Sequence, residues 1–117
     1  MRSSRLGPYA RDVLDLDAKH QLEHLHETSI QNIAFFTLAL GGEVGELQNL
    51  VKKLWREGPS QELYEAILEE SVDVLIYFVE LVNILPGDFD QAWDAKHEVL
   101  KKRFQEKFPN GYKLQEL

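Results

Sequence analysis

The chain has 117 residues and no cysteine, with 44% hydrophobic residues, 28% charged residues and a formal net charge of −7. This composition predicts one soluble globular domain over residues 1–117, without disulfides or thiolate chemistry, and the negative charge argues against a nucleic acid polymer, whose binding needs a basic face. Because no apolar stretch reaches the roughly 18 uncharged residues of a membrane span and no apolar signal segment follows Met1, we expect no membrane contact and a cytoplasmic location.

The N-terminal part of the chain has the weakest pattern. Residues 1–8 end in Gly7-Pro8 and are expected to form a flexible lead-in. A first helix is predicted from about Tyr9 to His26, on a weak apolar face. It carries three of the four histidines, namely His20, His24 and His26. Histidines four residues apart can clamp a transition metal, and the alternative is a solvated polar face.

A second and a third helix are predicted on either side of a clear turn signal. Thr28-Ser29-Ile30-Gln31 has the form of a capping box, so the second helix should begin near Ser29 and carry its apolar stripe to Trp55. In Glu57-Gly58-Pro59-Ser60, Gly can close one helix, Pro prevents its continuation and Ser can cap the next. The two helices should therefore form an antiparallel hairpin.

The third helix is predicted to be buried, because residues 72–85 are apolar nearly all round. Leu85-Pro86-Gly87-Asp88 should end it, and Asp88 can cap a fourth helix, which the short link predicts to be antiparallel. The expected fold is all-α, an antiparallel four-helix bundle. Its excess apolar surface predicts self-association as a homodimer or homotetramer.

Four acidic residues occupy matched positions of the hairpin. Glu43 and Glu46 lie one turn apart on the second helix, as do Glu70 and Asp73 on the third. Since 43 and 73 average to 58, as do 46 and 70, Glu43 should face Asp73 and Glu46 should face Glu70, roughly 18 Å from the turn at Gly58. Clustered carboxylates repel unless a hard cation lies among them, so the pattern predicts Mg²⁺ or Mn²⁺. The alternative is a set of solvated helix acids.

These motifs resemble those of the MazG-like superfamily of all-alpha nucleoside triphosphate pyrophosphohydrolases. The resemblance is carried by Gly42-Glu43-Val44-Gly45-Glu46-Leu47 with Lys52-Lys53 after it, and by Glu69-Glu70-Ser71-Val72-Asp73-Val74 with Tyr77 one turn on. It extends from about residue 39 to residue 111. Two positions depart from the family pattern, since Gly42 replaces a common first Glu and His97 stands where many members carry Asn.

The resemblance implies an enzyme that cleaves a nucleoside triphosphate, by analogy a pyrimidine deoxynucleotide, to the monophosphate and pyrophosphate. Mg²⁺, or Mn²⁺, would be held by the four acids, Glu43, Glu46, Glu70 and Asp73. The catalytic base that takes a proton from the attacking water is left open between Glu43 and Glu69. Substrate contacts are expected from Lys53, Trp55, Tyr77, Lys96, His97 and Arg103, with Phe36 as another ring that could stack on the base.

Two other classes of protein fit parts of the sequence. A ferritin-like dimetal carboxylate bundle uses Glu together with Glu-x-x-His pairs, and Glu23 to His26 has that form while Asp94 to His97 is a near match. A non-catalytic helical dimerisation module would leave all the acids solvated. Iron colour after purification favours the first class, and the absence of any divalent-metal effect on stability favours the second.

Overall fold

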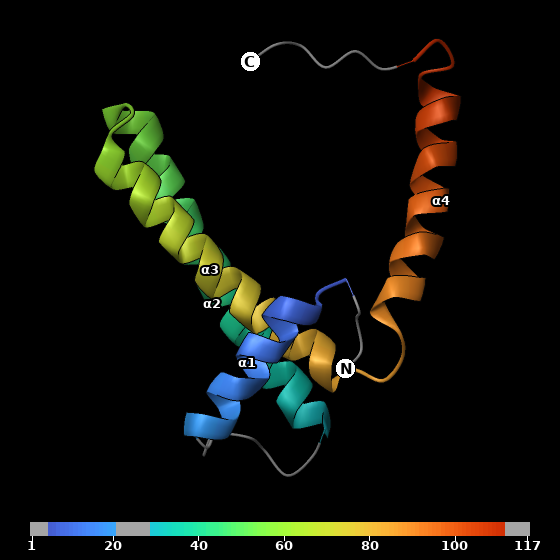
Figure 1. The fold of residues 1–117 in the computed structure, drawn as a ribbon. Helices are drawn as coiled ribbons and strands as arrows, with labels where there is room; N and C mark the ends of the chain where they lie inside the picture. Colours follow the sequence, from blue (N-terminus) through green and yellow to red (C-terminus); the bar gives the residue numbers. More distant parts are fainter. Residues whose placement is uncertain (1–4, 21–28, 112–117) are drawn as a thin grey trace.

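The computed structural model describes residues 5–20 and 29–111, with side chains for 5–13 and 30–111. This part of the chain consists of helices without strands (Figure 1), in the order α1 (Gly7–His20), α2 (Ser29–Glu57), α3 (Gln61–Ile84) and α4 (Phe89–Lys107). The all-α class predicted from the sequence is therefore confirmed for the described residues. None of these helices is both long and apolar enough to cross a membrane.

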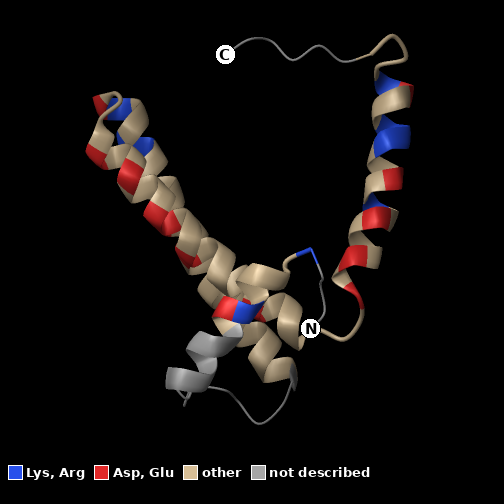
Figure 2. Ribbon diagram, viewed as in Figure 1, with Lys and Arg blue, Asp and Glu red and all other residues tan. Residues whose placement is uncertain are grey.

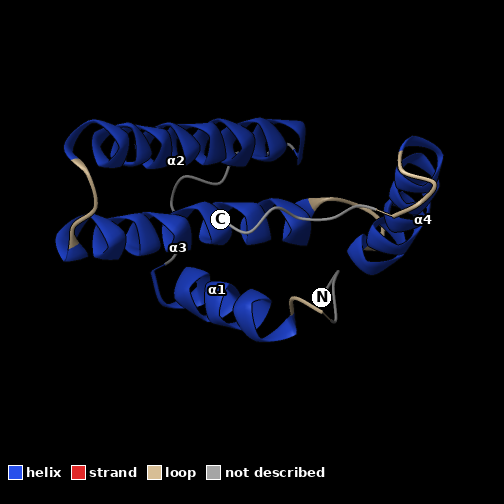
Figure 3. Ribbon diagram, turned by 90° about the horizontal axis from the view of Figure 1, so that it is seen from above, coloured by secondary structure: helices blue, strands red, loops and turns tan. Residues whose placement is uncertain are grey.

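α2 and α3 form a hairpin in which the two long helices lie side by side (Figures 1 and 3). Gly58 closes α2 with a φ of +85°, a conformation that favours glycine, and its N–H donates to the carbonyl of Leu54 at 2.9 Å. Ser60 then caps α3, because its Oγ accepts a hydrogen bond from the Leu63 N–H at 3.1 Å. The turn and both helix ends are confirmed where the sequence predicted them.

α1 packs against α3 near the end of the hairpin that lies opposite its turn. Ala10 and Val13 of α1 and Val79 of α3 make a buried cluster, on which Leu75 and Ile76 also pack. The helix begins at Gly7 and not at Tyr9, because Pro8 suits a first helical turn, so the predicted lead-in of residues 1–8 is too long. The predicted continuation of this helix to His26, with His24, lies outside the described residues.

α4 begins where the sequence predicted it but takes another direction. The Asp88 carboxylate accepts hydrogen bonds from the N–H groups of Asp90 and Gln91, at 2.9 and 3.2 Å, which confirms the cap. The helix nevertheless projects away from the hairpin, and none of its residues is buried (Figures 1 and 3). The prediction that α4 runs back along α3 is therefore wrong for the single copy. A short link limits the distance between two helix ends, but it does not fix their angle.

Two contacts hold the first turns of α4 in this open position. The rings of Phe78 and Phe89 meet edge to face at 5.6 Å between centroids, and the Arg5 guanidinium pairs with both carboxylate oxygens of Asp94 at 2.9 and 3.2 Å. Because α4 stands apart, α3 is less buried than its sequence predicted: Val72, for example, is 56% exposed. Within one copy, the described residues do not form the four-helix bundle.

The cap of α3 gives a first test of this fold. Ser60→Ala removes the hydroxyl that accepts the Leu63 amide, so we expect the free energy of unfolding to fall by about 1 kcal/mol, the usual effect of losing an N-cap. Ser60→Asp keeps an acceptor at the positive end of the helix and should remain close to the parent protein. Urea denaturation monitored by circular dichroism measures both. Equal stability of Ser60→Ala and the parent would show that the cap does not stabilise the hairpin.

Candidate metal centre

Three carboxylates from the two helices of the hairpin come together in its middle. Glu43 and Glu46 extend from α2 and Glu70 from α3, and one oxygen of each lies within 4.8 Å of the other two. Glu43 and Glu70 are half-buried, whereas Glu46 is exposed. The packing of α2 on α3 therefore places negative groups at ligand spacing, with one side of the cluster open to solvent.

The electrostatics of this cluster are unfavourable when all three groups are charged. Oε2 of Glu43 and Oε1 of Glu70 are buried and receive no hydrogen bond from an N–H or O–H group. The pKa of Glu70 rises from 4.5 to about 8, first because its protonated form hydrogen-bonds to Glu43, then because of burial, and then because of the hydrogen bond and negative charge of Glu46. A proton on Glu70 thus takes the place that a cation would take among these oxygens.

The surface beside the acids on α2 is open. A Cβ atom built on Gly41, Gly42 or Gly45 would meet no other atom within 4 Å. The packing of this copy therefore does not require glycine at these positions, although glycine in a helix interior costs about 1 kcal/mol relative to alanine. The backbone next to Glu43 and Glu46 remains accessible to a ligand or to another chain.

Asp73 is not among the three clustered carboxylates of the described residues, so the predicted set of four is assembled only in part. Glu70 interacts with both Glu43 and Glu46. Asp73 acts instead on Tyr77. The pKa of Tyr77 is raised by burial first, then by the negative charges of Glu43, Glu80 and Asp73. Tyr77 therefore lies beside the acids, as predicted.

Glu80 is a buried acid that the predicted site did not include. Its exposed fraction is only 6%, and it acts on the Tyr77 hydroxyl. Nδ2 of Asn83, which comes three residues later on α3, is buried without a hydrogen-bond acceptor. The sequence signal for this polar strip was available, because Glu80 interrupts the apolar run of the third helix, and a charged group in such a run needs polar neighbours.

The other predicted site residues lie away from the carboxylates. Glu69 is exposed and outside the group of three, and Lys53 and Trp55 are exposed near the turn, with Trp55 88% accessible. Phe36 is buried and packs edge to face against Phe35, so it serves the core. The remaining three residues are on α4, which stands apart from the hairpin; they are Lys96, His97 and Arg103.

The ferritin-like alternative gains no second pair from the described residues. His97 and Asp94 are both on α4, away from the acid cluster. The His97 ring stacks on Trp93 with 6.1 Å between ring centroids, and Asp94 pairs with Arg5. Glu23, His24 and His26 lie outside the described residues. The carboxylate group that the structure does assemble contains no histidine.

Comparison of the chain with models of known families, with curated proteins and with solved structures gives no match. The likeness to the MazG-like superfamily thus rests on the motifs in this sequence.

The raised pKa of Glu70 predicts how stability depends on pH without metal. A carboxyl whose pKa is about 8 in the folded state and 4.5 when unfolded stabilises the fold fully below pH 4.5, and this contribution is lost as the pH rises through 8. Thermal melts in chelator between pH 5 and 9 should show this decline for the parent protein. Glu70→Gln should remove the decline, because its amide does not titrate.

Glu69→Gln is the matched control, because Glu69 is the exposed neighbour of Glu70 and is not among the three clustered acids. This variant should keep the decline of the parent protein. If the melting temperatures of parent and Glu70→Gln change in parallel across the range, the Glu70 carboxyl does not hold a proton in the folded state.

Proposed function

We propose that this protein is a cytoplasmic, Mg²⁺-dependent nucleoside triphosphate pyrophosphohydrolase that releases a nucleoside monophosphate and pyrophosphate. The observation that carries the proposal is the convergence of Glu43, Glu46 and Glu70, with buried oxygens that receive no hydrogen-bond donor. Such oxygens suit Mg²⁺, which is held in nucleotide enzymes by one or a few carboxylates together with substrate phosphates and water. The reaction class comes from the resemblance of the motifs.

Mg²⁺ bound there would neutralise charge on the phosphates and lower the pKa of the attacking water. Glu43, Glu46 and Glu70 would hold it, and Glu70 would release its proton on binding because the metal needs the charged carboxylate. The water oxygen forms a bond to the α-phosphorus while the bond from that phosphorus to the bridging oxygen breaks. The β and γ groups therefore leave joined, as pyrophosphate.

The proton of the attacking water needs a base near the metal. Glu69 is exposed and adjacent to Glu70 in the chain, so it is a candidate base that need not also hold Mg²⁺, while Glu43 is the candidate within the cluster. Asp73 is the fourth ligand implied by the resemblance. In the described geometry it lies beside Tyr77, so its role is tested separately below.

Substrate would approach the acids over the open glycine surface of α2, with Tyr77 beside them. The cations expected to contact its phosphates, Lys96 and Arg103, belong to α4, as does His97. They reach an acid cluster only if α4 lies against a hairpin. An antiparallel bundle of four helices also needs α4 to lie against a hairpin. Because α4 does not do so within one copy, we propose that the chain functions as a homodimer or homotetramer.

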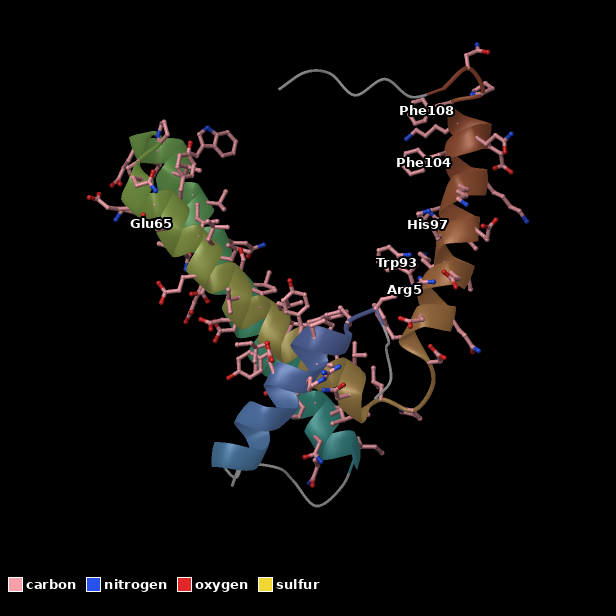
Figure 4. All side chains as sticks on the ribbon, viewed as in Figure 1. Arg5, Glu65, Trp93, His97, Phe104 and Phe108 are labelled. Atoms are coloured by element: carbon pink, nitrogen blue, oxygen red, sulfur yellow. The ribbon has the colours of Figure 1, made fainter. Side chains whose placement is uncertain are left out.

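The activity is tested with a panel of ribo- and deoxynucleoside triphosphates, pyrimidine deoxynucleotides included, in Mg²⁺ or Mn²⁺. At least one should yield monophosphate and pyrophosphate in equal amounts. Glu70→Gln should lower kcat roughly hundredfold or more, because several kcal/mol of transition-state charge stabilisation are lost with a ligand. Glu65→Gln, an exposed acid on the same helix (Figure 4), should leave kcat unchanged.

Asp73→Asn distinguishes three ligands from four in the same assay. A loss as large as that of Glu70→Gln assigns Asp73 to the metal, and a smaller loss assigns it to the surroundings of Tyr77. Release of orthophosphate without pyrophosphate, or full activity of the parent protein in chelator, would contradict the proposed reaction.

Metal binding is tested without substrate. Glu46→Gln should raise the melting temperature in chelator, because it removes one repelling charge, and should reduce the gain from added Mg²⁺, because it removes one ligand. Differential scanning fluorimetry with and without Mg²⁺ measures both effects, and Glu65→Gln should change neither. If Mg²⁺ stabilises parent and Glu46→Gln equally, the carboxylates do not form its site, and the dimerisation module becomes the better interpretation.

A further inference from the structure

One face of α4 is apolar and uncovered in the single copy. Trp93 and Phe104 are 54% and 52% exposed, and Leu100 lies between them at helical spacing. The side chains of Trp93, His97, Phe104 and Phe108 lie on the same side of the helix (Figure 4), the side nearer the hairpin in this view. The last part of this face is hollowed into a groove of about 240 Å³, lined by Leu100, Arg103, Phe104, Lys107 and Phe108.

A second uncovered apolar stripe runs along α3. Tyr64, Leu68 and Val72 are exposed and follow one another at four-residue spacing, so they lie on one face of the helix. At 1.5 Å per residue, this stripe is about 12 Å long, and the stripe from Trp93 to Phe104 is about 17 Å long. The two stripes are therefore similar in length as well as in character.

The charges beside the two stripes are opposite. Glu65 and Glu69 flank the α3 stripe at helical spacing, and α3 carries no Lys or Arg (Figure 2). The second half of α4 is basic, with Lys101, Lys102, Arg103 and Lys107 against the single acid Glu106 (Figure 2). Apolar faces flanked by opposite charges are the arrangement by which paired helices select one another.

We propose that α4 of one copy packs along α3 of a second copy, and that the exchange is reciprocal in a two-fold dimer. The copy's own α4 projects away from its hairpin, with the Arg5–Asp94 pair and the contact of Phe78 with Phe89 at its first turns. The α3 of a second copy presents the same apolar stripe, and α4 can reach it without breaking these contacts. Exchange of one helix between two identical chains covers both stripes on both copies and closes the assembly.

The oligomeric state of the full chain gives the first test. Light scattering at micromolar concentration should give twice the chain mass of 13.6 kDa. Leu68→Glu and Phe104→Glu should each raise the dissociation constant at least tenfold, because each places a charge on a covered stripe. Leu38→Glu is the matched control: this leucine of α2 is 77% exposed, belongs to neither stripe and should leave the dimer intact.

All three substitutions are at exposed sites, and circular dichroism should show unchanged helix content. A monomeric parent protein overturns the proposal. So does a control that dissociates the dimer as strongly as Leu68→Glu, because the contact would then not be specific to the two stripes.

Zero-length carbodiimide cross-linking identifies which copy supplies α4. Unlabelled and ¹⁵N-labelled chains are unfolded, mixed and refolded, and lysine-to-carboxylate links are read by mass spectrometry. Links from Lys101, Lys102 or Lys107 to acids of α3 should join light and heavy peptides. If links join only peptides of the same label, α4 folds back on its own hairpin. If no link joins α4 to α3, something other than α4 covers the α3 stripe. Either result overturns the exchange, and neither depends on nucleotide hydrolysis.

Discussion

The repulsion among three carboxylates held at fixed positions is the constraint on which the site depends. Glu43 and Glu46 are carried by one long helix and Glu70 by its neighbour, so packing of the hairpin prevents them from separating. The charge must therefore be compensated where it is, by a proton on Glu70 or by a cation. The capped turn between Gly58 and Ser60 sets the register that brings them together. Local turn chemistry and the electrostatics of a distant site are thus linked through the rigidity of two helices.

Local rules predicted most of this hairpin from the sequence. Gly58, Ser60 and Asp88 act on their own neighbouring backbone groups, so their roles can be read without knowledge of the fold. The heights of the acids followed from a constant rise per residue, which is why Glu46 and Glu70 were paired correctly. That Asp73 is not among the three clustered acids could not be predicted in this way, because rotation of each helix about its axis is set by side-chain packing between helices. Periodicity along one helix contains no information about that packing.

The course of α4 could not be predicted because long-range contacts decide it. The Arg5–Asp94 pair joins residues 89 positions apart, and no local pattern indicates it. The pair is exposed, and such pairs contribute little to stability; the contact of Phe78 with Phe89 also joins α3 to the start of α4. The uniform apolar character of residues 72–85 predicted a buried helix. It did not reveal that one copy leaves Leu68 and Val72 in solvent.

Acidic and basic residues are unevenly distributed between the hairpin and α4, and α4 stands apart from the hairpin. In one copy the hairpin concentrates carboxylates, with no Lys or Arg on α3, while the second half of α4 concentrates cations beside the half-exposed ring of Phe104. Contact between an α4 and the α3 of another copy would reduce both the uncovered apolar area and the uncompensated charge.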